Sequence, residues 1–267
     1  MDTSTFFEAD EVEALRDRAV KARAMQPRHD ARWVKAEADP MALLAVFDRL
    51  RMKPGWVLRA WRISTSFDGG GMVFALPAGA PFPEPEVKPP ERRPGLPPGA
   101  VGEVMTLIEG DGSPASYLHA SLFAREAREF GAEWHALQWS NHVILCRDPR
   151  GPLDPEKPWR TVKGLPSTFD VPPSAPSAPR PAAPGGAPPP PVGPPMVEGW
   201  ALAGEWPAEW RPECRSLEDG RTQLRFHVYS EHMFRRIVRV TDTYPPGGAV
   251  FSTQEKWIVS APGGFVY

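Results

Sequence analysis

The distribution of proline constrains this chain more than any other feature of its sequence. The chain has 35 prolines, of which nine fall in residues 77–98 and twelve in residues 171–195. Proline fixes φ and lacks a backbone N–H, so neither segment can form a regular helix or a central strand. The regular structure must therefore come from the rest of the chain.

The second proline-rich segment, VPPSAPSAPRPAAPGGAPPPPVGPP, has no aromatic side chain and only two valines as large aliphatic ones. It has nothing to bury that would offset the entropy lost on ordering. We therefore predict an extended linker over residues 166–196 with polyproline II character. A docking motif for a proline-binding domain is the alternative role of this segment.

Length and composition are those of an ordinary globular protein. The 267 residues are 41% hydrophobic and 24% charged, enough for a buried core in one large or two small domains. The formal net charge of -2 excludes a chain-wide positive field that would attract nucleic acid or an anionic membrane. Any such binding would need a local basic patch.

Several features predict a cytoplasmic protein. The first 25 residues lack the basic region and apolar stretch of a signal peptide. The longest apolar run, at 41–47, is far shorter than the ~20 residues that span a bilayer, so we predict no membrane partner. Cys146 and Cys214 lie far apart and fit reduced thiols. The excess of arginine over lysine, with abundant alanine, proline and glycine, is typical of a GC-rich bacterial genome.

Helices are predicted where apolar side chains recur at a spacing of about 3.6 residues, in residues 8–25, 39–52 and 113–131. The second and third begin with a capping residue, Asp39 and Ser113, each followed by proline at the first helical position. The apolar stripe of the first helix is thin, which indicates weak packing or a contact with a partner.

Strands are predicted where apolar and polar residues alternate or β-branched and aromatic residues cluster. The glycine runs, including Gly69–Gly71, are interpreted as turns because none matches a phosphate loop or dinucleotide fingerprint, and we predict no cofactor. The expected strands are 56–64, 72–76, 102–109, 130–146 (as one bent strand or a tight hairpin), 221–230, 233–244 and 249–261.

These elements predict an α+β fold: two or three helices on an antiparallel sheet, followed by a C-terminal β meander joined through the proline-rich linker. The meander has too few residues to bury much by itself, so we expect it to pack on the first domain. The predicted divisions are a polar helix in 1–28, an α+β domain in 29–165, the linker in 166–196 and the meander in 197–267.

The densest cluster of candidate catalytic side chains is FGAEWHALQWSNHVILC, residues 130–146. On a strand, His142 and Cys146 would share a face about 13 Å apart, too far to hold one metal ion, and no zinc-binding spacing occurs in the chain, so we predict no metal site. The other functional hypothesis for this segment is nucleophilic catalysis by Cys146, with His142 or His119 as the base. Cys146 ends an apolar run, which favours a small core residue instead.

The chain has ten tryptophans. Tryptophan side chains most often fill cores or cover the contact between two packed parts of a protein. We expect Trp134 and Trp139 to meet Trp200, Trp206 and Trp210 at the join between the two halves of the protein. Residues 130–146 are therefore interpreted mainly as a packed segment.

A candidate binding surface lies in the C-terminal strands. In residues 221–230, Arg225, His227 and Tyr229 alternate with apolar residues and would face one way, where arginine could meet phosphates while an aromatic ring stacks a base. Alternatively, these polar side chains form only the solvated face of an antiparallel sheet, with no binding role. Further binding candidates on the next strand are Arg235, Arg236 and Arg239.

No catalytic constellation is visible in the sequence, which favours a non-enzymatic binding or adaptor protein that holds a macromolecular partner by aromatic and arginine-rich surface. A protein partner is favoured over nucleic acid. The alternatives are a nucleic-acid or nucleotide-binding module that uses the arginine strands, and a small hydrolase or transferase that depends on Cys146 or the histidines.

Overall fold

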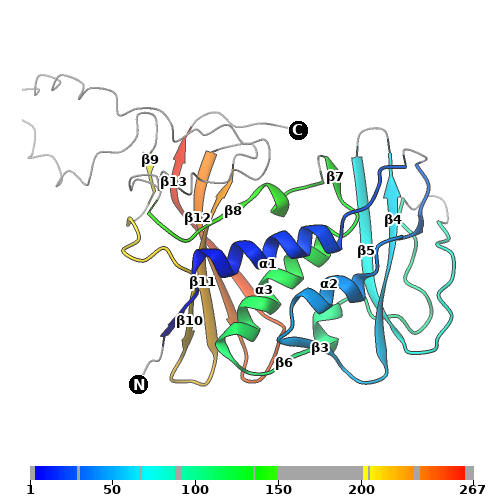
Figure 1. Ribbon diagram of the computed structural model, residues 1–267, viewed down its shortest axis with the longest axis horizontal. Helices are drawn as coiled ribbons and strands as arrows, with labels where there is room; N and C mark the ends of the chain where they lie inside the picture. Colours follow the sequence, from blue (N-terminus) through cyan, green and yellow to red (C-terminus); the bar gives the residue numbers. More distant parts are fainter. Residues whose placement is uncertain are drawn as a thin grey trace, which may run out of the picture.

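A computed structural model describes residues 4–28, 31–65, 68–87, 92–134, 136–148, 201–203, 205–230 and 235–261. The predicted linker, with its alternative as a docking motif, lies outside these residues. The described part is an α+β protein with three α-helices and antiparallel sheets, and it includes the C-terminal meander, so the predicted fold class is confirmed (Figure 1). Within it, no helix has the length and apolar character needed to cross a membrane.

The three helices are α1 (Ala9–Ala22), α2 (Pro40–Val46) and α3 (Pro114–Arg128). Asp39 caps α2 by accepting a hydrogen bond from the Met41 N–H at 2.9 Å, and Ser113 caps α3. Helix α2 ends earlier than the predicted 39–52, because residues 50–52 pair with another strand instead of continuing the helix.

The larger sheet contains the predicted C-terminal meander. Its central strands pair antiparallel in the order β10-β11-β12-β13, and segments from elsewhere in the chain add β1, β8 and β9. The strands are β1 (Ser4–Phe6), β8 (Val143–Leu145), β9 (Ala201–Leu202), β10 (Glu213–Ser216), β11 (Thr222–Ser230), β12 (Arg235–Tyr244) and β13 (Ser252–Ala261).

A second antiparallel sheet has the order β2-β4-β5-β7, and β3 pairs with β6 separately. The predicted strand 102–109 is wrong in its first half, where a 3-10 turn, η1 (Val104–Leu107), precedes a short strand. The strands are β2 (Val34–Lys35), β3 (Leu50–Met52), β4 (Trp56–Ser64), β5 (Asp68–Pro77), β6 (Ile108–Gly110) and β7 (Glu133–Trp134).

The glycine run 69–71 is part of β5, so its prediction as a turn is wrong. The hairpin between β4 and β5 closes earlier, where the Thr65 N–H donates to the Asp68 carbonyl at 2.7 Å. Gly69, Gly70 and Gly71 then pair in register with the last residues of β4.

The segment 130–146 is neither one bent strand nor a hairpin. Strand β7 pairs with β5 in the second sheet, whereas β8 pairs with β11 in the larger sheet. Between them lies a 3-10 turn, η2 (Trp139–Asn141). The segment therefore crosses from one sheet to the other, which a periodicity of two residues could not reveal.

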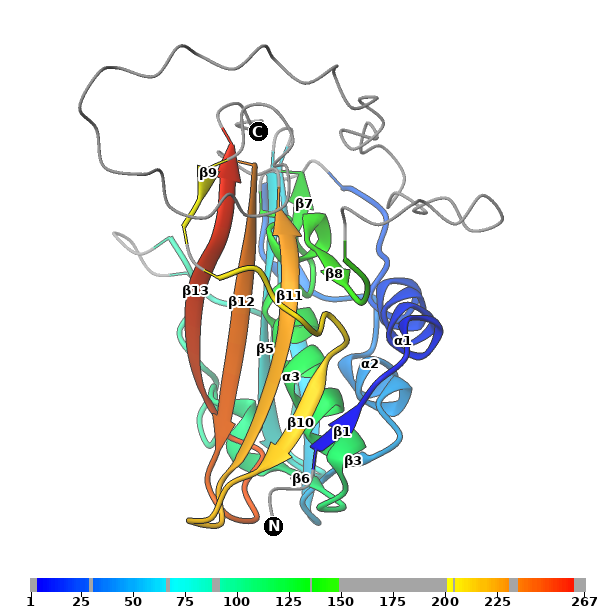
Figure 2. The ribbon, with the colours of Figure 1, turned by 90° about the vertical axis from the view of Figure 1, so that its left-hand side faces the viewer.

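The helices lie between the two sheets, with α3 in the middle of the molecule (Figures 1 and 2). One continuous hydrophobic core joins the helices to the facing sides of both sheets. From α1 it includes Val12, Leu15 and Ala19, the thin stripe seen in the sequence. The first helix is thus part of the core despite its polar composition.

Two buried carboxylates, one in the last turn of α3 and one on its C-terminal capping residue, hold the turn η2 in place. Glu126, which is fully buried, accepts from Arg23 Nε at 2.8 Å and from the indole Nε1 of Trp139 at 2.9 Å. Glu129 accepts from the backbone N–H groups of Trp139 and Ser140. Polar groups in this dense segment therefore serve packing between α1, α3 and η2.

A second buried ion pair joins α3 to the meander. Both guanidinium nitrogens of Arg125 reach the Asp242 carboxylate, at 2.8 and 3.0 Å, and Asp242 also accepts from Ser121 and from Thr253 Oγ1. The Arg125 guanidinium lies among the rings of three aromatic residues: Trp139, Phe226 and Phe251. This pair ties residues more than a hundred positions apart.

For the residues that the structure describes, Trp139 does not meet Trp206 and Trp210 as expected, although each group contacts the other half of the chain. Trp139 packs against Phe226 on the helix-facing side of the larger sheet. Trp206 and Trp210 contact each other in a separate cluster on the opposite side of that sheet. The side chain of Trp134 and all of Trp200 lie outside the described residues.

Candidate functional site

The alternation predicted for strand β11 places its side chains on two faces of the larger sheet. Leu224, Phe226 and Val228 are buried in the main core. The intervening Arg225, His227 and Tyr229 therefore lie on the outer face, away from the helices. This outer face of strands β10 to β13 is turned toward the viewer in Figure 2.

The part of the outer face around Tyr229 and Ile237 is covered. The chain between β9 and β10 crosses in front of β12 and β11, and it carries the tryptophans of the separate cluster. Trp210 lies 4.8 Å from the ring of His227, measured between ring centroids, and Tyr229 belongs to the same cluster. His227 is only 2% exposed and Tyr229 only 4%.

The lower half of the outer face is open and polar. The strand register places His227, Arg239 and Lys256 side by side in one row, and Arg225, Thr241 and Gln254 in the next. Glu213 lies opposite Arg225 at the edge of the second row. We call this surface the arginine face, and define it as Arg215, Gln223, Arg225, Arg239, Thr241, Thr243, Gln254 and Lys256.

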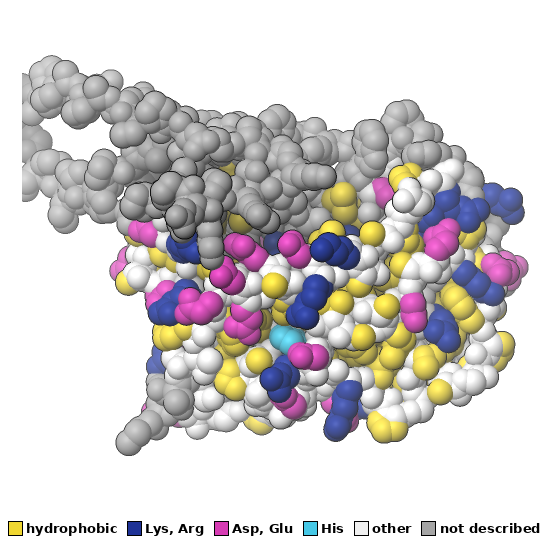
Figure 3. All heavy atoms as spheres, in the orientation of Figure 1, with side chains coloured by type: hydrophobic (Ala, Val, Ile, Leu, Met, Phe, Trp, Pro, Cys, Tyr) yellow, Lys and Arg dark blue, Asp and Glu magenta, His cyan; other side chains and the backbone are white. Residues whose placement is uncertain are grey.

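The arginine face is more basic than the chain as a whole. It holds four cationic side chains, and on the described part of these strands Glu213 is the one carboxylate among its rows. The Arg225 guanidinium is 3.4 Å from Glu213, with 39% of the arginine side chain exposed. By contrast, acidic and basic side chains are interspersed on the face over α1 and α2 (Figure 3).

The charges of the arginine face act on one another. Burial, followed by the positive charge of Arg225, lowers the pKa of Arg239, and the negative charge of Glu205 acts in the opposite direction. Burial, followed by the charge of Arg239, lowers the pKa of His227 to about 4, so this imidazole is neutral at pH 7. Its Nε2 accepts from Arg239 Nε at 3.4 Å. A neutral histidine thus accepts a hydrogen bond from the partly buried Arg239.

The other predicted binding residues are dispersed. Arg236 pairs with Ser230 and lies over the ring of Trp257 at 5.4 Å, on the helix-facing side of the sheet. The side chain of Arg235 is outside the described residues. The structure therefore brings together Arg225, His227 and Arg239 of the predicted set, with His227 beneath the surface.

Sequence reasoning missed Lys256, which the register places beside Arg239. Gln254 and Lys256 do alternate with neighbouring residues, as a strand face requires. However, β13 has a bulge opposite Ile237 and Val238, and this shifts the alternation partway along the strand. The polar pattern was therefore visible only over a few residues.

The three catalytic candidates occupy separate structural settings. His119 is buried on α3, where its ring contacts Phe47 and its Nδ1 accepts from the Arg49 N–H at 3.4 Å. His142 follows η2 and its ring lies edge-on to Trp139. Cys146 follows β8 and is buried in the main core.

Burial also makes the thiols poor nucleophiles. It raises the pKa of Cys146 to about 12, with a further contribution from Glu13, and it raises the pKa of Cys214 to about 12. A thiol with such a pKa stays protonated at neutral pH, whereas the thiolate is the reactive form. The environment of Cys146 is that of a core residue.

We therefore expect neither cysteine of the folded protein to react at pH 7 with an aromatic disulfide reagent on the timescale that modifies unfolded protein completely. The absorbance of the released thiolate measures this, and the protein in denaturant serves as the control with two reacting thiols. Rapid reaction of one thiol in the folded protein would contradict this, and would favour a nucleophilic Cys146.

Among the described residues, no group of three or more histidine, cysteine, aspartate or glutamate side chains could hold a metal ion. Searches against protein-family models, curated proteins and solved structures find no match to this chain. We therefore infer the function from the chemistry of the arginine face.

Proposed function

We propose that the protein is a non-enzymatic binding protein and that its arginine face holds an acidic surface of a protein partner. The observation that carries the proposal is the gathering of four cations on the open half of a sheet, where the strands themselves contribute one carboxylate, Glu213, and Glu205 acts on Arg239 from outside them. Arg225 is partly exposed and Lys256 is exposed, so both can reach a partner. Guanidinium groups bind carboxylates by paired hydrogen bonds, which gives orientation as well as affinity.

The character of the arginine face favours a protein over a nucleic acid. Recognition of single-stranded nucleic acid usually needs exposed aromatic rings on which bases stack. His227 and Tyr229, the residues that could have supplied such rings, are buried. Phe6, at the β1 edge of the same sheet, lies beneath the guanidinium of Arg211 at 4.9 Å. The polar, hydrogen-bonding character of the face suits acidic side chains better.

Neutralising the arginine face tests this proposal. We expect the triple substitution R225Q, R239Q and K256Q to weaken binding of a fluorescent glutamate-rich peptide about tenfold, because three exposed ion pairs of about 0.5 kcal/mol each are lost. Fluorescence anisotropy measures the affinity at two salt concentrations. The wild-type affinity should fall with salt, and that of the variant should change less.

The matched control replaces three exposed cations elsewhere, R18Q, K21Q and R51Q, and lowers the net charge by the same amount. It should bind the peptide as the wild type does. Equal losses in both triple variants would mean that net charge alone attracts the peptide, and would overturn the proposal. Tighter binding of a single-stranded oligonucleotide than of the peptide, lost in the first triple variant alone, would replace the protein partner by nucleic acid.

A further inference from the structure

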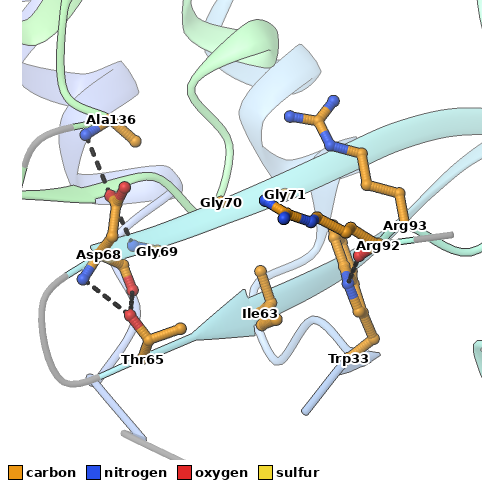
Figure 4. A pocket seen from close by; sticks show the side chains of 10 residues that line it. All are labelled: Trp33, Ile63, Thr65, Asp68, Gly69, Gly70, Gly71, Arg92, Arg93 and Ala136. Carbon is orange, nitrogen blue, oxygen red and sulfur yellow. Dashed lines mark hydrogen bonds between the residues drawn. The ribbon is translucent and has the colours of Figure 1, made fainter. Parts of the chain in front are cut away.

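A separate hollow of about 290 Å³ lies in the second sheet, at the end of the β4–β5 hairpin. Strand β5 forms its floor at Gly70, and Arg92 and Arg93 extend across that strand (Figure 4). Thr65 and Asp68 lie at one end of the hollow and Trp33 at the other (Figure 4). The helices separate this hollow from the arginine face (Figure 1).

Two of the three glycines in the floor are needed for packing. A Cβ atom on Gly71 would lie 1.8 Å from the carbonyl oxygen of Phe130, which no side chain tolerates. A Cβ atom on Gly69 would lie 2.7 Å from the side chain of Glu133. Both glycines therefore allow the end of α3 and strand β7 to approach β5 closely.

Gly70 has no such reason to be glycine. A Cβ atom there would meet nothing within 4 Å, and Gly70 is not among the glycines with positive φ. Glycine inside a strand is destabilising by roughly 0.5–1 kcal/mol relative to alanine. Glycine at position 70 therefore lowers stability relative to alanine. The absence of a side chain there leaves the hollow open.

The walls of the hollow combine positive charge with a flat ring. Among the described residues, no carboxylate forms an ion pair with Arg92 or Arg93. The Trp33 Nε1–H donates to the Arg92 carbonyl at 3.1 Å, so the indole offers the hollow its ring and holds the arginine-bearing segment in place. The Asp68 carboxylate also lines the hollow, at the end away from Trp33, where its Oδ1 accepts from the N–H groups of Gly69 and Ala136.

We propose that this hollow binds a small anion that carries a flat ring, such as a nucleoside monophosphate or an aromatic carboxylate. The anionic group pairs with Arg92 and Arg93, and the ring lies over Gly70 beside Trp33. The volume is close to the lower end of the range for small-molecule sites, about 300 Å³. The site is independent of the arginine face, so either proposal can fail without the other.

Isothermal titration calorimetry with four probes tests the ligand class: AMP, adenosine, inorganic phosphate and benzoate. We expect the wild type to bind AMP or benzoate in the millimolar range or better, and adenosine and phosphate at least about tenfold more weakly. If AMP binds and benzoate does not, the ligand is a nucleotide; the reverse result indicates a carboxylate. If adenosine bound as tightly as AMP, the anionic group would not contribute to binding. If phosphate bound as tightly as AMP, the ring would not contribute.

Two variants test the location of the site. G70A adds a Cβ that meets nothing within 4 Å, and G70V adds a larger side chain to the floor. G70V should lower the affinity for the bound probe at least about tenfold, with an unchanged or higher midpoint of thermal unfolding, and G70A should have an intermediate effect. The double variant R92Q and R93Q should also bind the probe at least about tenfold more weakly. The control variant R51Q should bind the probe as the wild type does. Unchanged affinity in G70V, or no saturable binding of any probe by the wild type, would contradict the proposal.

Discussion

Replacing Asp242 by alanine is expected to lower the free energy of unfolding by about 3–5 kcal/mol, because it leaves the Arg125 guanidinium charged and unpaired among aromatic rings. The Asp242 side chain is fully buried and that of Arg125 is 13% exposed. The substitution also leaves the hydroxyl groups of Ser121 and Thr253 without this acceptor. Urea unfolding followed by circular dichroism measures the change.

A double substitution separates the loss of the pair from the loss of the carboxylate alone. D242L combined with R125M removes both charges and should recover most of the lost stability, as apolar replacements of buried pairs often do. As a control, E109A breaks an exposed ion pair with Arg51 and should cost less than about 1 kcal/mol. If D242A were no more harmful than E109A, the buried pair would not stabilise the join between α3 and the meander.

Acid is expected to destabilise the protein through His227 before most carboxylates titrate. The folded protein lowers the pKa of this histidine from 6.5 to about 4, so the unfolded chain binds the extra proton between these values. Stability therefore falls as the pH falls from about 6.5 to 4, and the loss amounts to about 3 kcal/mol once the pH is below 4.

The pH dependence of urea unfolding between pH 7 and 4.5 measures this effect. H227Q removes the titrating group and should flatten the profile across this window. His119 also has a pKa lowered by burial, so H119Q should flatten the profile too, through its own contribution. Parallel profiles for the wild type and H227Q would show that His227 is not held neutral in the folded protein.

Much of the fold could be predicted from local patterns. The capped starts of α2 and α3, the alternation in β11 and the order of the meander all follow from residues close together in the chain. Pairings between distant segments could not be predicted in this way, and β1 with β10 and β8 with β11 are examples. No local periodicity records which distant strand will complete a sheet.

The buried charges also could not be predicted from local sequence patterns. Glu126 has the appearance of an ordinary surface residue in a helix, since glutamate is almost never fully buried unless it is paired. Its partners Arg23 and Trp139 come from α1 and η2, and only the assembled fold shows that all three meet.

The candidate sites were partly visible in the sequence. Alternation correctly placed Arg225 and His227 on one face of β11. Which part of that face stays open depends on the segment that carries Trp210, and this is a tertiary contact. The hollow above Gly70 was hidden because a run of glycines has the composition of a turn, whatever structure it finally adopts.

The larger sheet combines strands from distant parts of the chain, and this affects how the protein can fold during synthesis on the ribosome. Strand β1 and helix α1 are translated before α3, whereas strands β10 to β13 of the larger sheet follow α3 in the chain. Until β10 and β11 have been translated, the side of α3 that faces the larger sheet lacks the strands on which it packs. A nascent chain in this state exposes apolar surface, and completing the larger sheet then requires the closure of long loops.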